Sequence, residues 1–536
     1  MLNTVNIVSL ILLSALVLLA LFFRRPSIRA SLSGWQIALL SALIVLLTAL
    51  RLLRFGAVPG GMNQDGAMAA VDALALSQHG TDRFGTWLPA HFTAWGYGQM
   101  SVLLSYCMVP FIRLFGLSVI TARLPVLLWS LAGMGASYAF LRRSLGERAA
   151  LAGLLFLAVD PWHFMQSRWA LDCNLFPHCF LVGFALLYAG REKPWSLYLS
   201  MLFFALCMYA YGVSFLMVPL FLVLAVFMLR VPFRRVLLCV LLYLGLSWPI
   251  YGTMLLNALG RDTIALPFVT MPAFPASVRA GDILFFSAHP GAQLLKNLRA
   301  LWGVGFLQEP DLIWNAIDGF GTVYLCSAPL LLYGLLLTLR DALRGKKVWA
   351  RLLLCYWFCA LLLGLLVNEV NVNRLNILFY AHLLLIARGM EGLIAFRRES
   401  AAALFACYGL LAGLFFTQYF GPWAERMETV FFQDFLTAVS CADGRENDTQ
   451  VYITPDTQYP GSANVSEILT LFAQKIDAQY FQSADYAAHY HYRNPDFDAL
   501  AQEEGRIVCV VKSAPAIPEG WTQIDFGSYR LLEKRG

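Results

Sequence analysis

The sequence predicts an all-α polytopic membrane protein, and two observations carry that prediction. Hydrophobic residues make up 59% of the 536 residues, charged residues make up only 13%, and the mean hydropathy is +0.63. A water-soluble chain of this size needs more charged side chains to cover its surface. Apolar runs of roughly 17–25 residues, long enough to cross about 30 Å of hydrocarbon, recur along most of the chain. We therefore expect about twelve transmembrane helices with interfacial helices between them, followed by a small C-terminal α/β domain.

Twelve segments carry this pattern, and we interpret the first as a retained helix. A secretory signal carries its basic residues before the apolar core, whereas Arg24 and Arg25 follow the core here. The predicted spans are 6–23, 35–52, 120–141, 148–162, 175–190, 196–211, 213–229, 236–256, 322–340, 350–367, 374–390 and 401–420.

The stretch 99–117 is apolar enough to span, but Pro110 and Arg113 interrupt it. If it lies along the membrane surface, six short loops that hold 19 Lys and Arg fall on one side. Cytoplasmic loops carry such an excess, so we expect 99–117 to be an interfacial or re-entrant helix. The six loops are 24–34, 142–148, 191–195, 230–235, 340–351 and 388–400.

This topology places both termini on the side opposite the basic loops. The transmembrane domain is predicted over 1–420, with outer segments at 53–119, 160–174 and 257–321. Residues 421–536 are predicted to form a small extracytoplasmic α/β domain.

Helical and strand patterns alternate in this C-terminal region. Cys441 and Cys509 could pair there if the region faces an oxidising compartment, although spacing alone does not bring their Cα atoms together. The helical patterns cover 425–440 and 466–480, and the strand patterns cover 451–453 and 507–511.

The net charge of +6 divides unevenly along the chain. Residues 1–424 hold 30 Lys and Arg against 16 Asp and Glu, whereas residues 425–536 hold 9 against 17. We interpret the basic part as the positive-inside bias of a membrane protein, and we expect no nucleic acid as a partner. The cysteines and histidines do not have the spacing of a zinc site.

The first outer segment offers a candidate catalytic carboxylate. Asp65 follows a Pro- and Gly-rich turn and precedes an amphipathic helix at about 66–78. A carboxylate at the membrane edge can act as a general base toward a hydroxyl group, and the alternative role is that of a helix N-cap. Asp72, inside the helix, is expected on its solvated face.

The second outer turn, VDPWHFMQSRWALDCNLFP at 159–177, concentrates polar side chains between two spans. Arg168 and Asp172 could form a structural ion pair at i, i+4, but charges beside hydrocarbon also mark functional sites. Arg suits a phosphate because its planar donors bind bidentately. His163 and Asn174 are supporting candidates, with packing or a local hydrogen bond as the alternative role for His163.

A third cluster, NEVNVNRLN at 368–376, opens the eleventh span. Arg374 stands at the start of that helix, where the helix dipole does not favour a cation. We therefore expect another group, such as a lipid phosphate, to attract its charge, and snorkelling to lipid headgroups is the alternative. Glu369 and Asn376 are supporting candidates.

These three clusters, in this order, resemble the GT-C class of polytopic glycosyltransferases, especially the branch of protein O-mannosyltransferases and lipid A aminoarabinose transferases. In that class an acidic residue follows the first core helix, as Asp65 does, and a shorter turn carries an Arg and an acidic residue, as SRWALD at 167–172 does. The resemblance covers residues 50–200, is looser up to 420 and is absent from the tail. Mannosyltransferases of the class usually pair the loop acid with a Glu where this chain has Gly66, which puts an acid pair or a shared metal in doubt.

The resemblance implies a glycosyltransferase that moves a monosaccharide, with inversion, from a polyprenyl-phosphate-linked donor to a hydroxyl of a lipid, glycan or protein acceptor. Asp65 would be the base, and Arg168 or Arg374 would stabilise the departing lipid phosphate. Asp172 would orient Arg168 or help to hold a divalent metal cation, the one cofactor considered. The expected location is the plasma membrane of a prokaryote, among membrane lipids, with the active site on the extracytoplasmic face.

Two other functions stay open. A flippase or other transporter of lipid-linked sugars would also use charges within the membrane, but it needs sites near the bilayer midplane, whereas these candidates cluster at one face. A polysaccharide polymerase or ligase also uses large outer loops and Arg residues. The position of Asp65 near the start of the chain favours the transferase.

Overall fold

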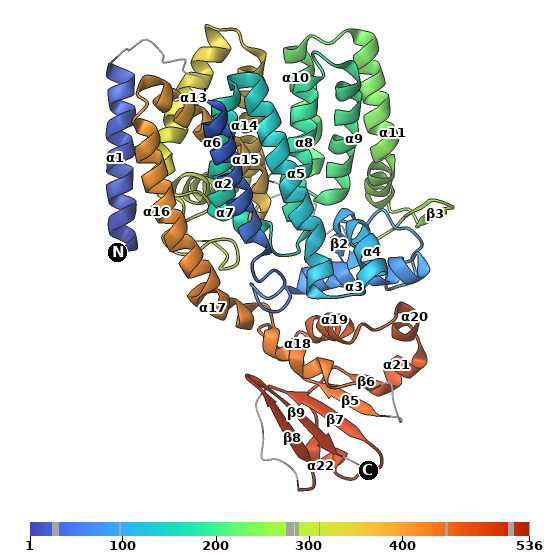
Figure 1. The fold of residues 1–536 in the computed structure, drawn as a ribbon. Helices are drawn as coiled ribbons and strands as arrows, with labels where there is room; N and C mark the ends of the chain where they lie inside the picture. Colours follow the sequence, from blue (N-terminus) through green and yellow to red (C-terminus); the bar gives the residue numbers. More distant parts are fainter. Residues whose placement is uncertain are drawn as a thin grey trace.

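The computed structural model describes residues 1–23, 32–95, 98–274, 284, 289–309, 311–444, 449–512 and 519–534. Long helices form a bundle, and an outer layer and a C-terminal sheet lie below it in Figure 1. The bundle consists of α1 (Leu2–Phe22), α2 (Gly34–Ala49), α5 (Val119–Leu145), α6 (Glu147–Val159), α8 (Leu175–Ala189), α9 (Pro194–Ala210), α10 (Ser214–Leu229), α11 (Phe233–Ala258), α13 (Ala328–Leu343), α14 (Val348–Leu366), α15 (Val372–Phe396) and α16 (Ser400–Phe420).

Each of the twelve predicted spans coincides with one of these helices. Within the described parts of the chain, nine helices are long and apolar enough to cross a membrane when adjoining 3-10 turns are included. The other three, α6, α9 and α10, have 13, 17 and 16 residues. The predicted fold class, a mostly helical polytopic membrane protein with a small C-terminal sheet, is confirmed, and length alone identifies nine spans.

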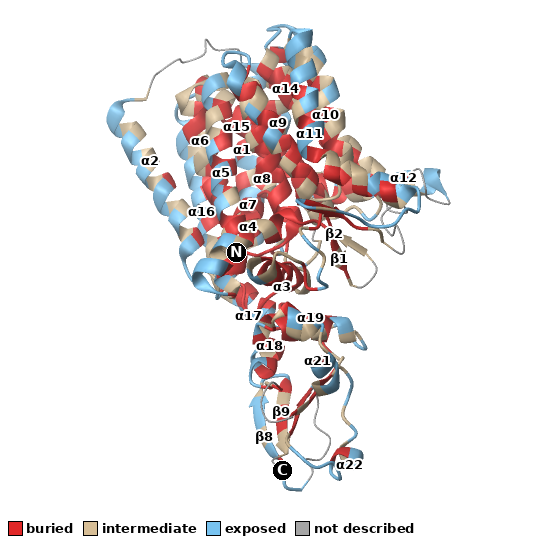
Figure 2. Ribbon diagram, turned by 90° about the vertical axis from the view of Figure 1, so that its right-hand side faces the viewer, coloured by how far each residue is buried: buried red, intermediate tan, exposed pale blue. Residues whose placement is uncertain are grey.

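Helix α15 forms the centre of the bundle and is buried along most of its length (Figure 2). It crosses α13 at two glycines. A Cβ atom at Gly334 would lie 1.8 Å from the Leu385 carbonyl oxygen, and one at Gly389 would lie 2.2 Å from the Leu330 carbonyl oxygen. The two backbones therefore approach more closely than larger residues would permit, as is common between membrane helices.

The outer layer lies across the end of the bundle that faces the C-terminal sheet, which we call the sheet end (Figure 1). It contains α3 (Gln64–His79), α4 (Leu103–Phe115) and the hairpins β1 (Phe92–Ala94)–β2 (Gly98–Met100) and β3 (Ile264–Leu266)–β4 (Val269–Met271). Helix α4 has 13 residues and is therefore about 20 Å long, too short for about 30 Å of hydrocarbon. It packs against α3 and α5, which agrees with the expectation that 99–117 lies at the interface.

The chain continues after α16 into a five-stranded sheet with the strand order β6-β5-β7-β9-β8. Strands β6, β5 and β7 are parallel neighbours, whereas β9 pairs antiparallel with both β7 and β8. The elements are α17 (Pro422–Val430), α18 (Gln433–Ser440), β5 (Gln450–Ile453), α19 (Ala463–Gln474), α20 (Ala478–Phe481), α21 (Ala484–His489), β6 (Tyr490–His491), α22 (Phe497–Leu500), β7 (Ile507–Val511), β8 (Thr522–Phe526) and β9 (Tyr529–Lys534).

Both predicted strands are confirmed as β5 and β7, and each predicted helical pattern is broken into two helices. Cys441 is exposed, Cys509 is buried in β7, and both are free cysteines, so they do not pair in this structure. The division of the chain at residue 420, with the remainder as a separate domain, stays a prediction.

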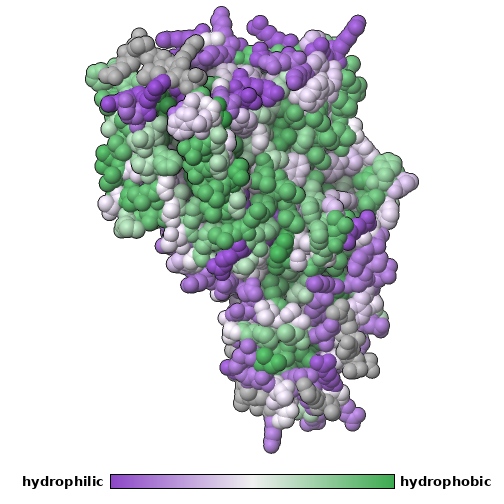
Figure 3. All heavy atoms as spheres, in the orientation of Figure 1, coloured by the Kyte–Doolittle hydropathy of each residue, from purple (hydrophilic) through white to green (hydrophobic). Residues whose placement is uncertain are grey.

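The surface shows how the bundle fits a membrane. On the face drawn in Figure 3, an apolar band covers the helices, and hydrophilic residues gather at both ends. The N-terminus of α1 and the C-terminal sheet lie on the same side of this band (Figure 1), as the predicted topology requires. The turns α5–α6 and α13–α14, which carry many of the basic residues, lie at the opposite end, which we call the basic end.

Candidate functional site

Asp65 lies in the first turn of α3, at the sheet end of the bundle. The N-cap of this helix is Asn63, whose side chain accepts a hydrogen bond of 3.0 Å from the Asp65 backbone N–H. The alternative interpretation of Asp65 as the N-cap is therefore wrong. The Asp65 side chain is half-buried, and the positive end of the helix dipole stabilises its charge.

Gly66 lets this first turn approach the Arg168–Asp172 segment closely. A Cβ atom at Gly66 would lie only 2.4 Å from the carbonyl oxygen of Ala170, a backbone atom that cannot move aside on its own. A Glu at this position would not fit the observed packing. The departure from the mannosyltransferase pattern thus has a steric reason, because the space for a second acid is filled by another segment of the chain.

The turn Asp172–Asn174 (η2) brings a second carboxylate to the same place. The Asp172 carboxylate is buried and accepts a hydrogen bond of 2.7 Å from the Cys173 backbone N–H. Asp172 and Asp65 both act electrostatically on the Cys173 thiol, so the two carboxylates share one neighbourhood.

Asn376, in the first turn of α15, ties this turn to the bundle. Its amide nitrogen lies 3.3 Å from the Cys173 carbonyl oxygen and 3.4 Å from Asn174 Oδ1, and its Oδ1 accepts a hydrogen bond of 2.8 Å from the Trp162 indole. The structure therefore joins Asn174 and Asn376, two of the predicted supporting residues, directly.

Arg374 stands two residues before Asn376, also in the first turn of α15. Its side chain is 19% exposed, donates to the Asn368 carbonyl oxygen, and lies 3.4 Å from the carboxylate of Glu369, which is 74% exposed. Asn371 caps the helix by accepting a hydrogen bond of 3.0 Å from the Arg374 backbone N–H. Arg374 is thus a cation that remains partly accessible at the edge of the bundle, next to the turn that carries Asp172.

Arg168 lies in a buried network of hydrogen bonds. Its guanidinium is fully buried, and it donates to the Tyr419 hydroxyl at 3.0 Å and to backbone carbonyl oxygens of the chain that enters the outer layer. These acceptors already occupy all its nitrogens, which favours a structural role, and the assignment of Arg168 to the donor phosphate stays a prediction. The carbonyl acceptors belong to Leu50, Arg51, Leu53, Arg54 and Val58.

A second buried arginine, Arg123 of α5, extends this arrangement. It donates to the carbonyl oxygens of Gly56, Pro59 and Gly61 at 2.7–3.2 Å. The segment 50–61 makes few hydrogen bonds within its own backbone. Arg168 and Arg123 therefore fix the conformation of the chain that leads to Asn63 and Asp65. The sequence analysis missed Arg123. In the sequence, an arginine within an apolar run cannot be distinguished from one whose side chain extends to the lipid headgroups.

His163 also belongs to the core rather than to the site. Its ring is fully buried and contacts Arg51 Nη2 through Nδ1 and the Tyr380 hydroxyl through Nε2, both at 2.9 Å. His178 reaches the same Tyr380 hydroxyl at 2.7 Å. His163 is therefore a member of a buried polar network, which agrees with the local hydrogen bond that the sequence offered as its alternative role.

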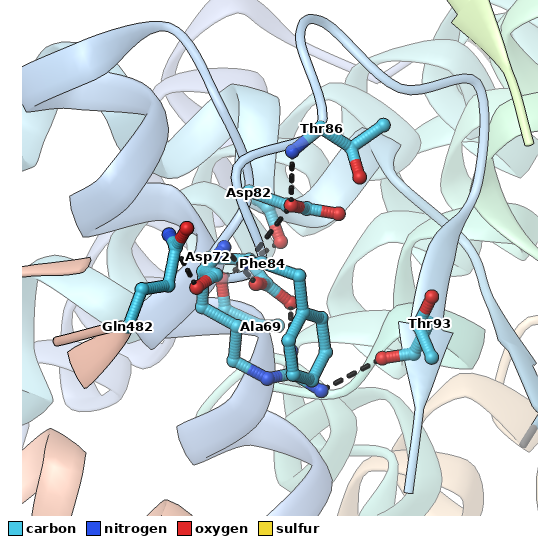
Figure 4. Close-up of polar contacts among 9 residues, drawn as sticks. Ala69, Asp72, Asp82, Phe84, Thr86, Thr93 and Gln482 are labelled. Atoms are coloured by element: carbon cyan, nitrogen blue, oxygen red, sulfur yellow. Dashed lines mark hydrogen bonds and ion pairs between the residues drawn. The ribbon is translucent and has the colours of Figure 1, made fainter. Parts of the chain in front are cut away.

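Asp72, expected on a solvated face, is instead fully buried. Its carboxylate binds Arg83 Nη1 at 2.5 Å and the Arg83 backbone N–H at 3.1 Å, and Arg83 Nη2 donates to the Thr93 carbonyl oxygen at 2.7 Å. Burial raises the pKa of Asp72 to about 7, against the lowering effect of Arg83. Figure 4 shows this cluster reaching Gln482 of the C-terminal region, whose amide donates to the Arg83 carbonyl oxygen at 3.0 Å.

Further contacts fix the C-terminal region against α3. His79 Nε2 lies 2.8 Å from Asp477 Oδ2, and the Phe84 and Phe481 rings are 6.1 Å apart. Helix α3, which carries Asp65 in its first turn, therefore ends in a contact with the C-terminal region.

Within the part of the chain that the structure describes, no group of three or more His, Cys, Asp or Glu side chains is arranged to hold a metal ion. Asp65 and Asp172 supply only two carboxylates to the site. The arrangement combines a half-buried carboxylate, a second buried carboxylate and a partly exposed arginine, which suits proton abstraction beside a phosphate.

Comparisons with known proteins agree with the fold. Residues 99–251 match a family model described as dolichyl-phosphate-mannose-protein mannosyltransferase. No curated protein matches the sequence. The crystal structure of ArnT from Cupriavidus metallidurans in the apo state is similar at a TM-score of 0.55 and 14% identity, covering 93% of this chain and 98% of that chain.

A second crystal structure of the same ArnT, bound to undecaprenyl phosphate, has a TM-score of 0.58 at 14% identity and covers 94% of this chain and 98% of that chain. At this identity the likeness establishes the fold. With the family match, it confirms the predicted resemblance to GT-C glycosyltransferases of the mannosyltransferase and aminoarabinose transferase branch.

Proposed function

We propose that this chain transfers a monosaccharide from a polyprenyl-phosphate-linked donor to an acceptor hydroxyl, with inversion, on the extracytoplasmic face of the membrane. The observation that carries the proposal is the close approach of the Asp65 turn to the turn of Asp172, which Gly66 permits. The undecaprenyl phosphate bound by the similarly folded ArnT supports a lipid phosphate as the carrier. The acceptor is a lipid, glycan or protein hydroxyl.

Each residue has a distinct role in this proposal. Asp65 accepts the proton of the acceptor hydroxyl, whose oxygen attacks the anomeric carbon while the bond to the lipid phosphate breaks. Arg374 stabilises the negative charge that develops on the departing phosphate, by charge-assisted hydrogen bonds. Asp172 orients polar groups of the sugar, and Asn174 and Asn376 fix its turn.

The topology supports a lipid-linked donor. The candidate residues lie at the sheet end, opposite the basic loops that mark the cytoplasmic side of membrane proteins. Soluble nucleotide sugars do not reach that face, whereas a sugar on a polyprenyl phosphate can enter laterally from the bilayer. The plasma membrane of a prokaryote is the setting that we propose.

The test is transfer of radiolabelled sugar from synthetic polyprenyl-phosphate donors by the full chain in liposomes. We expect Asp65→Asn to reduce transfer by at least a hundredfold, as loss of a general base does. Asp485→Asn is the matched control, because Asp485 also lies in the first turn of a helix, α21, but is exposed in the C-terminal region.

Full transfer by a folded Asp65→Asn variant would remove Asp65 as the base. Movement of the labelled donor across the bilayer without transfer to any acceptor would instead identify a flippase.

A further inference from the structure

A large cavity opens at the basic end of the bundle, on the far side from Asp65. It has a volume of about 1140 Å³ and is enclosed by the ends of α1, α13 and α15, the start of α2 and the turn between α5 and α6. Hydrophilic residues gather at this end of the surface (Figure 3). None of the residues assigned to the proposed transfer reaction lines this cavity.

The charges that line the cavity do not balance. Among the described residues, five basic side chains line it, and three acidic residues, Glu147, Asp341 and Glu391, accompany them. The acids are already engaged: Asp341 binds Arg388 and Lys347, Glu391 binds Arg388 and Arg148, and Glu147 binds Arg142 outside the cavity. The five basic residues are Arg148, Arg340, Arg344, Lys347 and Arg388.

Two of the basic residues, Arg340 and Arg344, have no acidic partner among the described residues. Both are exposed at the rim of the cavity. Arg388 is 7% exposed and is engaged by Asp341 and Glu391. The described lining of the cavity therefore presents a surplus of positive charge, which favours an anion.

Apolar side chains form another part of the cavity wall. Ala20 and Phe23 of the first helix segment, Ile37 of α2, Leu337 of α13 and Phe396 of α15 contribute to it. A small soluble anion would leave this apolar wall in contact with water, whereas a molecule with an anionic head and hydrocarbon chains would contact both the basic and the apolar side chains. Helix α2, which is exposed along most of its length, borders the cavity where such chains would leave toward the bilayer.

We infer that this cavity binds the phosphate headgroup of an anionic phospholipid of the leaflet opposite the proposed transfer site. Arg340 and Arg344 contact the phosphate, and the apolar wall contacts the upper part of the acyl chains. This inference does not depend on the proposed transfer reaction, because it concerns a ligand at the other end of the bundle and is tested by binding.

The experiment compares phospholipid binding to the full, delipidated chain by native mass spectrometry in detergent, with phosphatidylglycerol and phosphatidylcholine as probes. We expect one phosphatidylglycerol to bind in preference to phosphatidylcholine. A double variant, Arg340→Gln with Arg344→Gln, is expected to weaken that binding by roughly thirtyfold, because each basic residue beside an anionic lipid contributes roughly fivefold. Neither arginine has an ion-pair partner among the described residues, so the variant should fold.

The matched control is Arg234→Gln with Arg235→Gln, which removes the same charge from exposed residues at the basic end that do not line the cavity. This control should bind phosphatidylglycerol as the wild type does. Equal weakening by both double variants would overturn the inference, since it would indicate a diffuse effect of surface charge. Equal protection against thermal unfolding by inorganic phosphate and by phosphatidylglycerol would also overturn it, in favour of a soluble anion.

Discussion

Replacing Arg168 by Gln separates a structural role from a substrate role. Among the carbonyl oxygens that Arg168 contacts, those of Arg51, Leu53 and Val58 receive no other hydrogen bond among the described contacts. Each buried carbonyl left without a donor costs about 1–3 kcal/mol. Removing the buried charge recovers part of this cost, so we take the lower value for each group and expect a loss of about 3 kcal/mol.

The assay is thermal unfolding of the purified chain in detergent, followed by intrinsic tryptophan fluorescence, with donor affinity measured in parallel. Arg168→Gln should lower the apparent melting temperature by several degrees. Arg54→Gln is the matched control, because Arg54 belongs to the same segment but is exposed and makes a single hydrogen bond of 3.3 Å to the Phe420 carbonyl oxygen. An Arg168→Gln variant with wild-type stability and weakened donor binding would refute this reasoning and restore Arg168 as the phosphate ligand.

Three further predictions concern two close backbone contacts, at Gly66 and Gly389, and the buried carboxylate of Asp72. Gly66→Ala should destabilise the protein by about 1–3 kcal/mol through overpacking and should reduce sugar transfer, because the new Cβ atom meets the Ala170 carbonyl oxygen. The control is Gly135→Ala, whose Cβ atom meets nothing within 4 Å. This control should change neither thermal stability nor transfer. Gly389→Ala should destabilise the α13–α15 crossing by a similar amount, whereas Gly409→Ala, also in open space, should leave the melting temperature unchanged; equal melting temperatures would contradict the close approach. Burial raises the pKa of Asp72 to about 7 from its ordinary value near 4, so the folded chain keeps a proton that the unfolded chain releases, and stability falls as pH rises from about 4 to about 7. Asp72→Asn, measured by melting temperature against pH, should be less stable overall but show a shallower decline, and an unchanged slope would exclude Asp72 as its source.

The membrane helices could be predicted because the length and polarity of an apolar run are local properties of the sequence. The distribution of Lys and Arg among the short loops was needed to indicate that 99–117 does not span, and the 13-residue helix α4 agrees. Strands β8 and β9 were not predicted. Strand β8 has little buried surface, and it is stabilised mainly by pairing with β9, which a local pattern does not reveal.

The roles of charged residues were harder to predict. Arg168 and Arg374 both lie beside apolar runs, and the sequence does not indicate which of them faces backbone carbonyl oxygens and which stays accessible. The difference arises from segment 50–61, whose carbonyl oxygens become partners of Arg168 only in the folded chain. Likewise, the polar position of Asp72 in an amphipathic helix suggested solvent, because its partner Arg83 comes from the following loop.

The hydrogen bond between Arg168 and Tyr419 also has a consequence for biogenesis. The segment 50–61 is synthesised early, but the arginines that hold it arrive at positions 123 and 168, and the tyrosine that orients Arg168 arrives at the end of α16. The polar groups of this segment therefore do not have all their hydrogen-bond partners until about four-fifths of the chain has been inserted into the membrane. A ribosome-bound intermediate that stops before α16 should accordingly leave this segment open to proteases, and we expect the Asp65 turn to reach its full order only when α16 is in place.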